Sequence, residues 1–250
     1  YAPQGSRGPG FEQVHGKDAS NTALLIPAGL CRNSCPGPLA CRSSSTVVTS
    51  TLPSRCRRSA SHTSPLVADP RGVLVTGGAG YIGSHAAKAL SGAGYNVVVF
   101  DNLIGGHREA VRYGTLVEAD VTDVAAVRDA IRRHRIVAVM HFAALLDVGE
   151  SVREPARYYR NNVTGALGVL EAMAAESARY FVFSSTCATY GEPLETPIAE
   201  THPQRPINSY GETKLAVERA LPHFERAYGI HSVALRYFNA AGADPDAEIG

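Results

Sequence analysis

The feature that most constrains this chain is the stretch from residue 73 to residue 85, which reads VLVTGGAGYIGSH. A short β-branched run comes first, three glycines follow with the spacing G-x-x-G-x-x-G, and residues 81–90 have the pattern of an amphipathic helix. This order predicts a strand, a tight turn and a helix N-terminus. Glycines let the backbone approach a pyrophosphate, and the helix N-terminus offers it free N–H groups and a positive dipole end. We therefore expect Gly77, Gly80 and Gly83 to form a dinucleotide-binding turn.

A second predicted strand, residues 96–100, ends in Asp101. This carboxylate follows the glycines by roughly 20 residues, where an acceptor for a ribose 2′-hydroxyl is expected. An acidic residue here favours NAD over NADP, because it would repel a 2′-phosphate. A glycine pattern alone is a weak signal and also fits an ordinary loop. The strand, the helix and the acidic strand end together favour the dinucleotide site.

The rest of the chain alternates strand and helix. We expect further strands at residues 115–119, 135–142, 180–184 and 232–238. One helix is expected to begin after the N-cap Thr122 and to end at Arg133. Two further helices are expected over residues 155–175 and 210–228. Strands separated by helices predict an α/β fold with a doubly wound parallel (Rossmann) sheet. Ligands of such sheets bind beyond the carboxyl ends of the strands. Those ends are expected at Thr76, Asp101, Asp120, Phe142, Ser184 to Thr186, and Phe238 with Asn239.

Residues 1–70 differ in composition from the rest of the chain, and we divide the chain into 1–70 and 71–250. Pro, Gly, Ser, Thr and Arg dominate the first part, which predicts disorder because little apolar area can be buried there. The Arg- and Ser-rich character is typical of an organellar transit peptide, while a linker or sequence upstream of the true start fits equally well. The chain begins with Tyr and stops in mid-pattern, so we expect a fragment at both ends.

The composition excludes several classes of protein. Hydrophobic residues make up 44%, charged residues 19% and the net charge is +1, which gives no reason to expect nucleic acid or a membrane as partner. Four early cysteines lack the paired spacing of a zinc site, so we expect free thiols and no metal; they are Cys31, Cys35, Cys41 and Cys56. We expect a cytoplasmic protein, or a plastid protein if residues 1–70 are a transit peptide.

The second informative motif is YGETK, residues 210–214. Tyr210 and Lys214 lie four apart, so a helix places them on one face. A phenol with pKa near 10 is a poor base, but an ammonium and a positive nicotinamide ring would both lower that pKa. Thr186, just past the fifth strand, is placed to hydrogen-bond a reacting oxygen. The three predict a general base for alcohol oxidation, although each alone also fits an ordinary helix surface or strand end.

These motifs together resemble the extended short-chain dehydrogenase/reductase superfamily, and within it the NAD-dependent UDP-glucose 4-epimerases and close UDP-sugar relatives. The resemblance covers nearly everything after residue 72. The matching blocks are TGGAGYIGSH (76–85), FDNL (100–103), HFAAL (141–145), VGESV (148–152), YRNNV (159–163), FSSTCATYG (183–191), YGETK (210–214) and RYFNAAG (236–242).

The resemblance implies a reaction and a site. UDP-glucose and UDP-galactose would be interconverted by oxidation and re-reduction at sugar C4, with NAD regenerated in each cycle. Tyr210 would be the base, Lys214 and Thr186 its catalytic partners, and Thr186, Tyr210 and Asn239 would contact the UDP-sugar. Besides the three glycines, the residues implied to line NAD are Tyr81, Ile82, Asp101, Asn102, Leu103, Asp120, Val121, Phe142, Ala143, Ala144, Asn161, Lys214 and Phe238.

The resemblance also implies departures and alternatives. Leu146 stands where some epimerases carry a lysine, and the C-terminal substrate lobe would be largely missing. Related enzymes often form homodimers through two helices, here 155–175 and 210–228. A UDP-arabinose or UDP-xylose 4-epimerase is the nearest alternative. A nucleotide-sugar dehydratase, with an acidic pair where Cys187 and Ala188 stand, and a non-catalytic NAD-binding relative fit less well.

Overall fold

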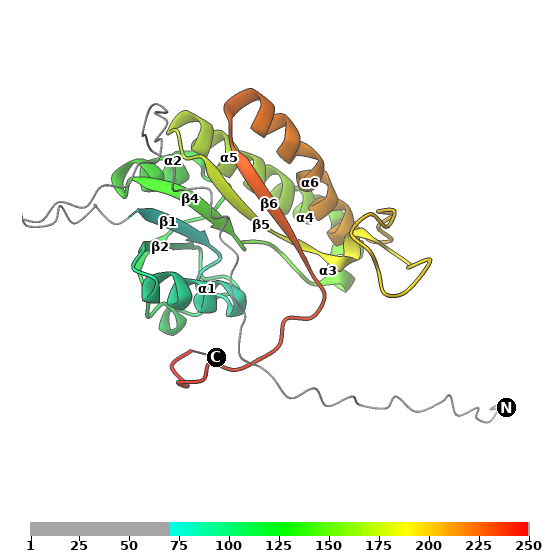
Figure 1. Ribbon diagram of the computed structural model, residues 1–250, viewed down its shortest axis with the longest axis horizontal. Helices are drawn as coiled ribbons and strands as arrows, with labels where there is room; N and C mark the ends of the chain where they lie inside the picture. The colour runs from blue at the N-terminus through cyan, green and yellow to red at the C-terminus, as the bar shows by residue number, and fades with distance from the viewer. Residues whose placement is uncertain (1–70, 250) are drawn as a thin grey trace, which may run out of the picture. The chain divides into compact units, whose positions relative to one another are not determined.

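The computed structural model describes residues 71–249 (Figure 1). The predictions made for residues 1–70, including disorder, the transit peptide and the four cysteines, lie outside the described residues. Among residues 71–249, no helix is long and apolar enough to cross a membrane.

Six parallel strands form one sheet in the order β3-β2-β1-β4-β5-β6, which confirms the predicted doubly wound topology. The chain winds outward from β1 to β3, returns to the centre, and then winds the other way from β4 to β6. The switch point therefore lies between β1 and β4, where ligands of such sheets bind. The strands are β1 (Gly72–Thr76), β2 (Asn96–Asp101), β3 (Thr115–Glu118), β4 (Ile136–His141), β5 (Tyr180–Thr186) and β6 (His231–Tyr237).

Helices cover both faces of the sheet (Figure 1). One face packs against α1, through a cluster that includes Val73, Val75 and Leu90. The other face packs against α2, α5 and α6, through a cluster that includes Leu74 and Leu170. Burial on both faces explains why the central strands are almost continuously apolar. The helices are α1 (Tyr81–Gly92), α2 (Val124–Arg133), α3 (Val148–Arg153), α4 (Pro155–Tyr158), α5 (Gly165–Ala175) and α6 (Ser209–Tyr228); short turns are η2 (Arg108–Ala110), η3 (Tyr159–Thr164) and η4 (Cys187–Thr189).

The predicted N-cap Thr122 is wrong. The cap of α2 is Asp123, whose Oδ1 accepts a hydrogen bond from the N–H of Ala126 at 3.0 Å. Thr122 instead donates its hydroxyl to Oδ1 of Asp120 at 2.6 Å. Thr and Asp both cap helices well. Here the Thr122 hydroxyl is hydrogen-bonded to the Asp120 carboxylate, so Asp123 caps the helix instead.

The predicted helical region over residues 155–175 is confirmed, but it is not α-helical throughout. It begins as α4 with Pro155 in its first turn, widens into the π-helical segment η3, and continues as α5. The helix α3, which sequence analysis did not predict, precedes it. The predicted strand ends differ from the structure by one or two residues, and β5 extends to Thr186, so this residue ends the strand instead of following it.

Candidate active site

The carboxyl ends of the strands border a cleft of about 1160 Å³. The glycine turn and the end of β2 line one part of it, while the ends of β4, β5 and β6 and the start of α6 line the rest. The structure thus brings together nearly all the predicted site residues. They are Gly77, Gly80, Tyr81, Ile82, Gly83, Asp101, Asn102, Asp120, Val121, Phe142, Ala143, Ala144, Asn161, Thr186, Tyr210, Lys214, Phe238 and Asn239.

Leu103 is the exception, since it is not among the described residues that line the cleft. Its N–H donates to Oδ1 of Asp101 at 2.8 Å, and its φ of 59° lies in the left-handed region. The chain therefore turns sharply after β2 and brings Ile104, which sequence analysis missed, to the cleft wall.

The glycine turn has no room for side chains at two positions. A Cβ at Gly77, whose φ is +71°, would lie 2.5 Å from the backbone nitrogen of Ala143, and one at Gly83 would lie 2.2 Å from the carbonyl oxygen of Gly77. Among the described residues, no side chain caps the N-terminus of α1, and its first turn contains no acidic residue. These features leave free N–H groups facing the cleft, so the turn fits the pyrophosphate of a dinucleotide.

Asp101 ends β2 and is 7% exposed. Its Oδ2 accepts from the N–H of Ala79 at 3.0 Å, while Oδ1 is bonded by Leu103. A carboxylate oxygen can accept two hydrogen bonds. Oδ1 and Oδ2 of Asp101 each have one donor in the chain, so each can accept a second hydrogen bond from a ribose hydroxyl. The neighbouring Asp120 accepts from Asn102 at 2.8 Å, and its hydrogen bonds with Thr122 hold its pKa below the usual value. Two carboxylates at adjacent strand ends disfavour a 2′-phosphate.

The start of α6 places Tyr210 and Lys214 at the cleft. Asn208 caps the helix, accepting from the N–H of Gly211 at 2.8 Å, so Tyr210 falls in the first turn and Lys214 one turn later. Lys214 Nζ donates to the carbonyl oxygen of Ser184 at 2.8 Å and lies 5.9 Å from the centre of the Tyr210 ring. Burial lowers the pKa of Lys214 to about 7, since a low-dielectric site disfavours the ammonium.

Two opposing effects act on the phenol of Tyr210. Burial raises its pKa, and a hydrogen bond with the Thr186 hydroxyl lowers it by a smaller amount, so the pKa lies above its ordinary value. In the chain alone the predicted net lowering of the Tyr210 pKa is therefore absent, because burial of the phenol outweighs its hydrogen bond with Thr186. The predicted lowering of the Tyr210 pKa by the positive nicotinamide ring concerns the protein with NAD bound.

Asn162 is a residue of the site that sequence analysis did not identify. It is 2% exposed, and its amide accepts from the N–H of Leu145 at 2.8 Å and donates to the carbonyl oxygen of the same residue at 3.0 Å. It also donates to the Thr213 hydroxyl at 3.2 Å. Asn162 thus ties the loop after β4 to the helix turn between Tyr210 and Lys214. The available signal is the polar pair Asn161-Asn162 within a predicted helical stretch.

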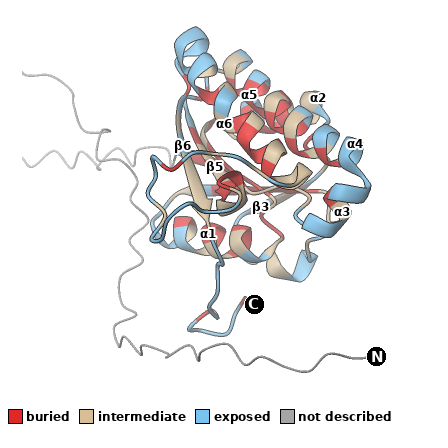
Figure 2. Cartoon of the chain, turned by 90° about the vertical axis from the view of Figure 1, so that its right-hand side faces the viewer, coloured by how far each residue is buried: buried red, intermediate tan, exposed pale blue. Residues whose placement is uncertain are grey.

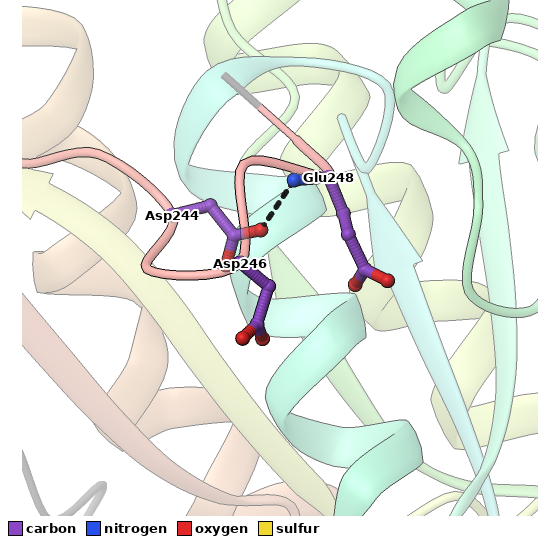
Figure 3. A group of neighbouring side chains, drawn as sticks. All are labelled: Asp244, Asp246 and Glu248. Atoms are coloured by element: carbon purple, nitrogen blue, oxygen red, sulfur yellow. Dashed lines mark hydrogen bonds between the residues drawn. The ribbon is translucent and has the colours of Figure 1, made fainter.

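After β6, the chain passes the cleft at Phe238 and Asn239 and returns to α1 (red in Figure 1). There Lys88 Nζ lies 2.8 Å from Asp244, 2.7 Å from Asp246 and 2.9 Å from Glu248. Figure 3 shows these three carboxylates on one turn, where the N–H of Glu248 also donates to Asp244 at 2.8 Å. The lysine ammonium supplies the positive charge that this acidic turn binds.

Comparison with known proteins identifies the family. Residues 73–249 match the model described as "NAD dependent epimerase/dehydratase family". The chain belongs to this family. It is 53% identical to UDP-glucose 4-epimerase of Rhizobium leguminosarum bv. trifolii and 51% identical to that of Rhizobium meliloti, each over 178 residues that make up 71% of this chain and 54% of the relative.

Solved structures of family members share the fold. UDP-glucose 4-epimerase from Brucella ovis in complex with NAD superposes with a TM-score of 0.71 at 53% identity, covering 72% of this chain and 55% of that one. The Stenotrophomonas maltophila enzyme with bound NAD and formylated UDP-arabinopyranose gives a TM-score of 0.70 at 39% identity, covering 72% and 56%. The chain thus spans about half the length of the relatives it matches, and the predicted family resemblance is confirmed.

Proposed function

We propose that this chain carries the cofactor-binding and catalytic half of a UDP-glucose 4-epimerase, which interconverts UDP-glucose and UDP-galactose. The single observation that carries the proposal is the convergence of Tyr210, Lys214 and Thr186 in the same cleft as the glycine turn and Asp101. The relatives at about half identity bear this enzyme name.

The residues of the cleft fit NAD as cofactor. The glycine turn and the first N–H groups of α1 would hold the pyrophosphate, and Asp101 would accept hydrogen bonds from the adenosine ribose. Lys214, fixed by the carbonyl oxygen of Ser184, keeps two further N–H donors for the nicotinamide ribose. When bound, NAD supplies a hydride acceptor that returns the hydride to the opposite face of the same carbon, so the reaction has no net redox change.

The chain's own residues move the proton. Tyr210 would take the proton of the sugar 4-hydroxyl as this carbon is oxidised and give it back on re-reduction. Thr186, which lowers the pKa of the phenol, would orient the phenol and the reacting oxygen. The ammonium of Lys214 would stabilise the phenolate. Asn239, at the mouth of β6, would contact the diphosphate of the substrate.

Cys187 and Ala188 follow Thr186 on the cleft wall. Neither is a carboxylate, so the acidic pair that dehydratases typically use to remove water from C5 and C6 of the sugar does not stand at this position. The site therefore favours epimerisation at C4 over dehydration.

The test is turnover of UDP-galactose, with UDP-xylose as the pentose alternative, by the protein expressed from its complete coding sequence. Tyr210→Phe should lower kcat by about 10²–10⁴-fold, because the general base is lost. Tyr228→Phe, at the exposed far end of α6, is the matched control and should keep its activity. Preference for UDP-xylose would reassign the sugar. Failure to convert either sugar, with NAD bound, would reject the epimerase.

We also propose that the protein forms a homodimer, as the resemblance implies. Among the described residues of α5, only Glu171 and Ala175 are exposed, while α6 exposes Arg219, Pro222, His223, Glu225, Arg226, Ala227 and Tyr228 (Figure 2). The outer face of α6 is therefore the available part of the predicted interface. Light scattering of the complete protein tests this proposal: a dimer that becomes a monomer in Arg226→Glu supports it, and a monomeric wild-type protein rejects it.

A further inference from the structure

Glu218 lies on α6 one turn after Lys214 and two turns after Tyr210, so the three share one helix face. Its side chain is only 8% exposed. Unlike Tyr210 and Lys214, it is not among the described residues that line the cleft. A carboxylate is thus buried behind the candidate catalytic pair, where the proposed reaction does not use it.

The two oxygens of Glu218 are fully occupied. Oε1 accepts from the Ser185 hydroxyl and from Nε of Arg236 at 3.1 Å. Oε2 accepts from the Gln204 amide at 3.0 Å and from the Arg236 guanidinium at 2.7 Å. Burial raises the pKa of Glu218, but the hydrogen bonds with Arg236, Ser185 and Gln204 outweigh it, so the pKa lies below its usual value. The carboxylate is therefore ionised at neutral pH.

Arg236 extends this arrangement away from the helix. Its Nη1 donates to the Tyr190 hydroxyl at 2.9 Å and to the carbonyl oxygen of Glu200 at 3.2 Å. The guanidinium also lies over the ring of Tyr190, 5.1 Å from its centre. Because Nε and Nη2 bind the Glu218 carboxylate while Nη1 binds Tyr190 and Glu200, the planar guanidinium is held in one orientation.

The partners of Glu218 sit next to site residues on other elements. Ser185 is the neighbour of Thr186 at the end of β5, and Arg236 precedes the cleft residues Phe238 and Asn239 at the end of β6. Since α6 carries the carboxylate itself, one side chain connects the three elements whose ends form the candidate catalytic part of the cleft.

We propose that Glu218 is a positioning residue, which acts through Ser185 and Arg236 to hold Thr186 and the exit of β6 in register with Tyr210 and Lys214. This inference rests on the proposed function for its kinetic consequence and on the structure alone for its effect on Tyr210. Loss of the carboxylate releases Ser185 and leaves a partly buried guanidinium without its counter-charge, so the ends of β5 and β6 can shift relative to α6.

Glu218→Gln tests the proposal by turnover, because glutamine has nearly the same shape but lacks the charge and carries an NH2 donor in place of one acceptor oxygen. The expected result is a kcat at least about 10-fold lower, with KM for the UDP-sugar within about twofold of wild type and NAD still bound. Glu225→Gln is the matched control, since Glu225 lies on the same helix, is half exposed and pairs with His231. A kcat within twofold of wild type in folded Glu218→Gln, whatever its melting temperature, overturns the proposal.

The ionisation of Tyr210 gives a second readout that needs no enzymatic turnover. In protein labelled with [¹³Cζ]tyrosine, the signal of Tyr210 is the one lost in Tyr210→Phe. Removing a negative charge would by itself lower the pKa of this phenol, whereas losing the Thr186 hydrogen bond would raise it. The proposal requires a rise in Glu218→Gln and no change in Glu225→Gln, and a fall or no change in Glu218→Gln contradicts it.

Turnover and the titration of Tyr210 together distinguish the proposed epimerase function from the proposed role of Glu218. An inactive wild-type protein rejects the epimerase but leaves the tyrosine titration to decide the role of Glu218. If Glu218→Gln does not fold, Arg236→Lys takes its place, because lysine keeps the charge but cannot make the forked contact with the carboxylate. It should show the same fall in kcat and the same rise in the Tyr210 pKa; wild-type values for both would reject the proposal.

Discussion

Lys214 donates its ammonium hydrogen bond to the carbonyl oxygen of Ser184, 30 residues earlier in the chain, at 2.8 Å. This contact joins the helix that carries Tyr210 to the strand that carries Thr186. It also keeps the lysine at the cleft, although burial lowers its pKa to about 7 and so makes the charged form costly. The position of the lysine is therefore set by the fold before any ligand binds.

Lys214→Met is expected to lower kcat by about 10²-fold or more and to weaken NAD binding, because methionine has similar length but no donor. Steady-state turnover and NAD titration of the complete protein measure the two effects. Arg133→Met, at the exposed end of α2, should change neither. Normal turnover by Lys214→Met would show that the lysine has only a packing role.

Two glycines of α1 are predicted to respond in opposite directions to the same substitution. Gly83→Ala would bring a Cβ to 2.2 Å from the Gly77 carbonyl, and we expect it to destabilise the protein by about 1–3 kcal/mol and to abolish NAD binding. Gly92→Ala would meet no heavy atom of the described residues within 4 Å and should stabilise by up to about 1 kcal/mol. Urea unfolding and NAD titration measure both variants, and equal effects would contradict this account of the turn.

The features predicted from sequence are those whose physical cause lies within a few residues. The glycine turn, the acidic end of β2 and the spacing of Tyr210 and Lys214 depend on local backbone and helix geometry. The parallel sheet was also predicted, because its short apolar strands and the helical patterns between them are both local features of the sequence. The error at Thr122 arose where two neighbouring residues, Thr122 and Asp123, compete for one role, which a sequence pattern cannot resolve.

The features that sequence analysis missed depend on partners that only the fold brings together. Asn162 bonds Leu145 across 17 residues, Glu218 bonds Arg236 across 18, and Lys88 bonds Asp244 across 156. Each is a polar residue on a helix, where a solvent-exposed role is the usual expectation. The raised pKa of Tyr210 was missed for the same reason, because it depends on how deeply the sheet and helices bury the phenol.

The contact of Lys88 with the acidic turn at residues 244–248 is predicted to hold the segment after Asn239 against α1. Lys88→Met should speed amide hydrogen exchange in residues 240–249, because three ion pairs are lost together with their hydrogen bonds. Wild-type exchange in the same segment should also rise with salt, since these charges are partly exposed and screened. Arg132→Met, which removes an exposed pair with Asp129, is the control. Unchanged exchange in Lys88→Met would show that backbone contacts alone hold the segment.

His141 is predicted to make the protein sensitive to acid. The ring is 1% exposed, its Nδ1 lies 2.8 Å from the Thr76 hydroxyl, and it stacks on Phe181 and Phe183. Burial lowers its pKa to about 3, whereas the unfolded chain keeps the ordinary value of 6.5. Between these two values the unfolded state binds the proton and the folded state does not, so stability falls as the pH falls through this window.

This one group should reduce the free energy of unfolding by about 1.4 kcal/mol per pH unit below pH 6.5. His141→Gln cannot titrate and should lack that part of the slope, even if its stability at pH 7.5 is lower. Urea unfolding of both proteins at pH 7.5, 6 and 5 measures the difference, because the carboxylates contribute equally to each. Parallel slopes would show that His141 is protonated in the folded protein and that the core around it admits the charge.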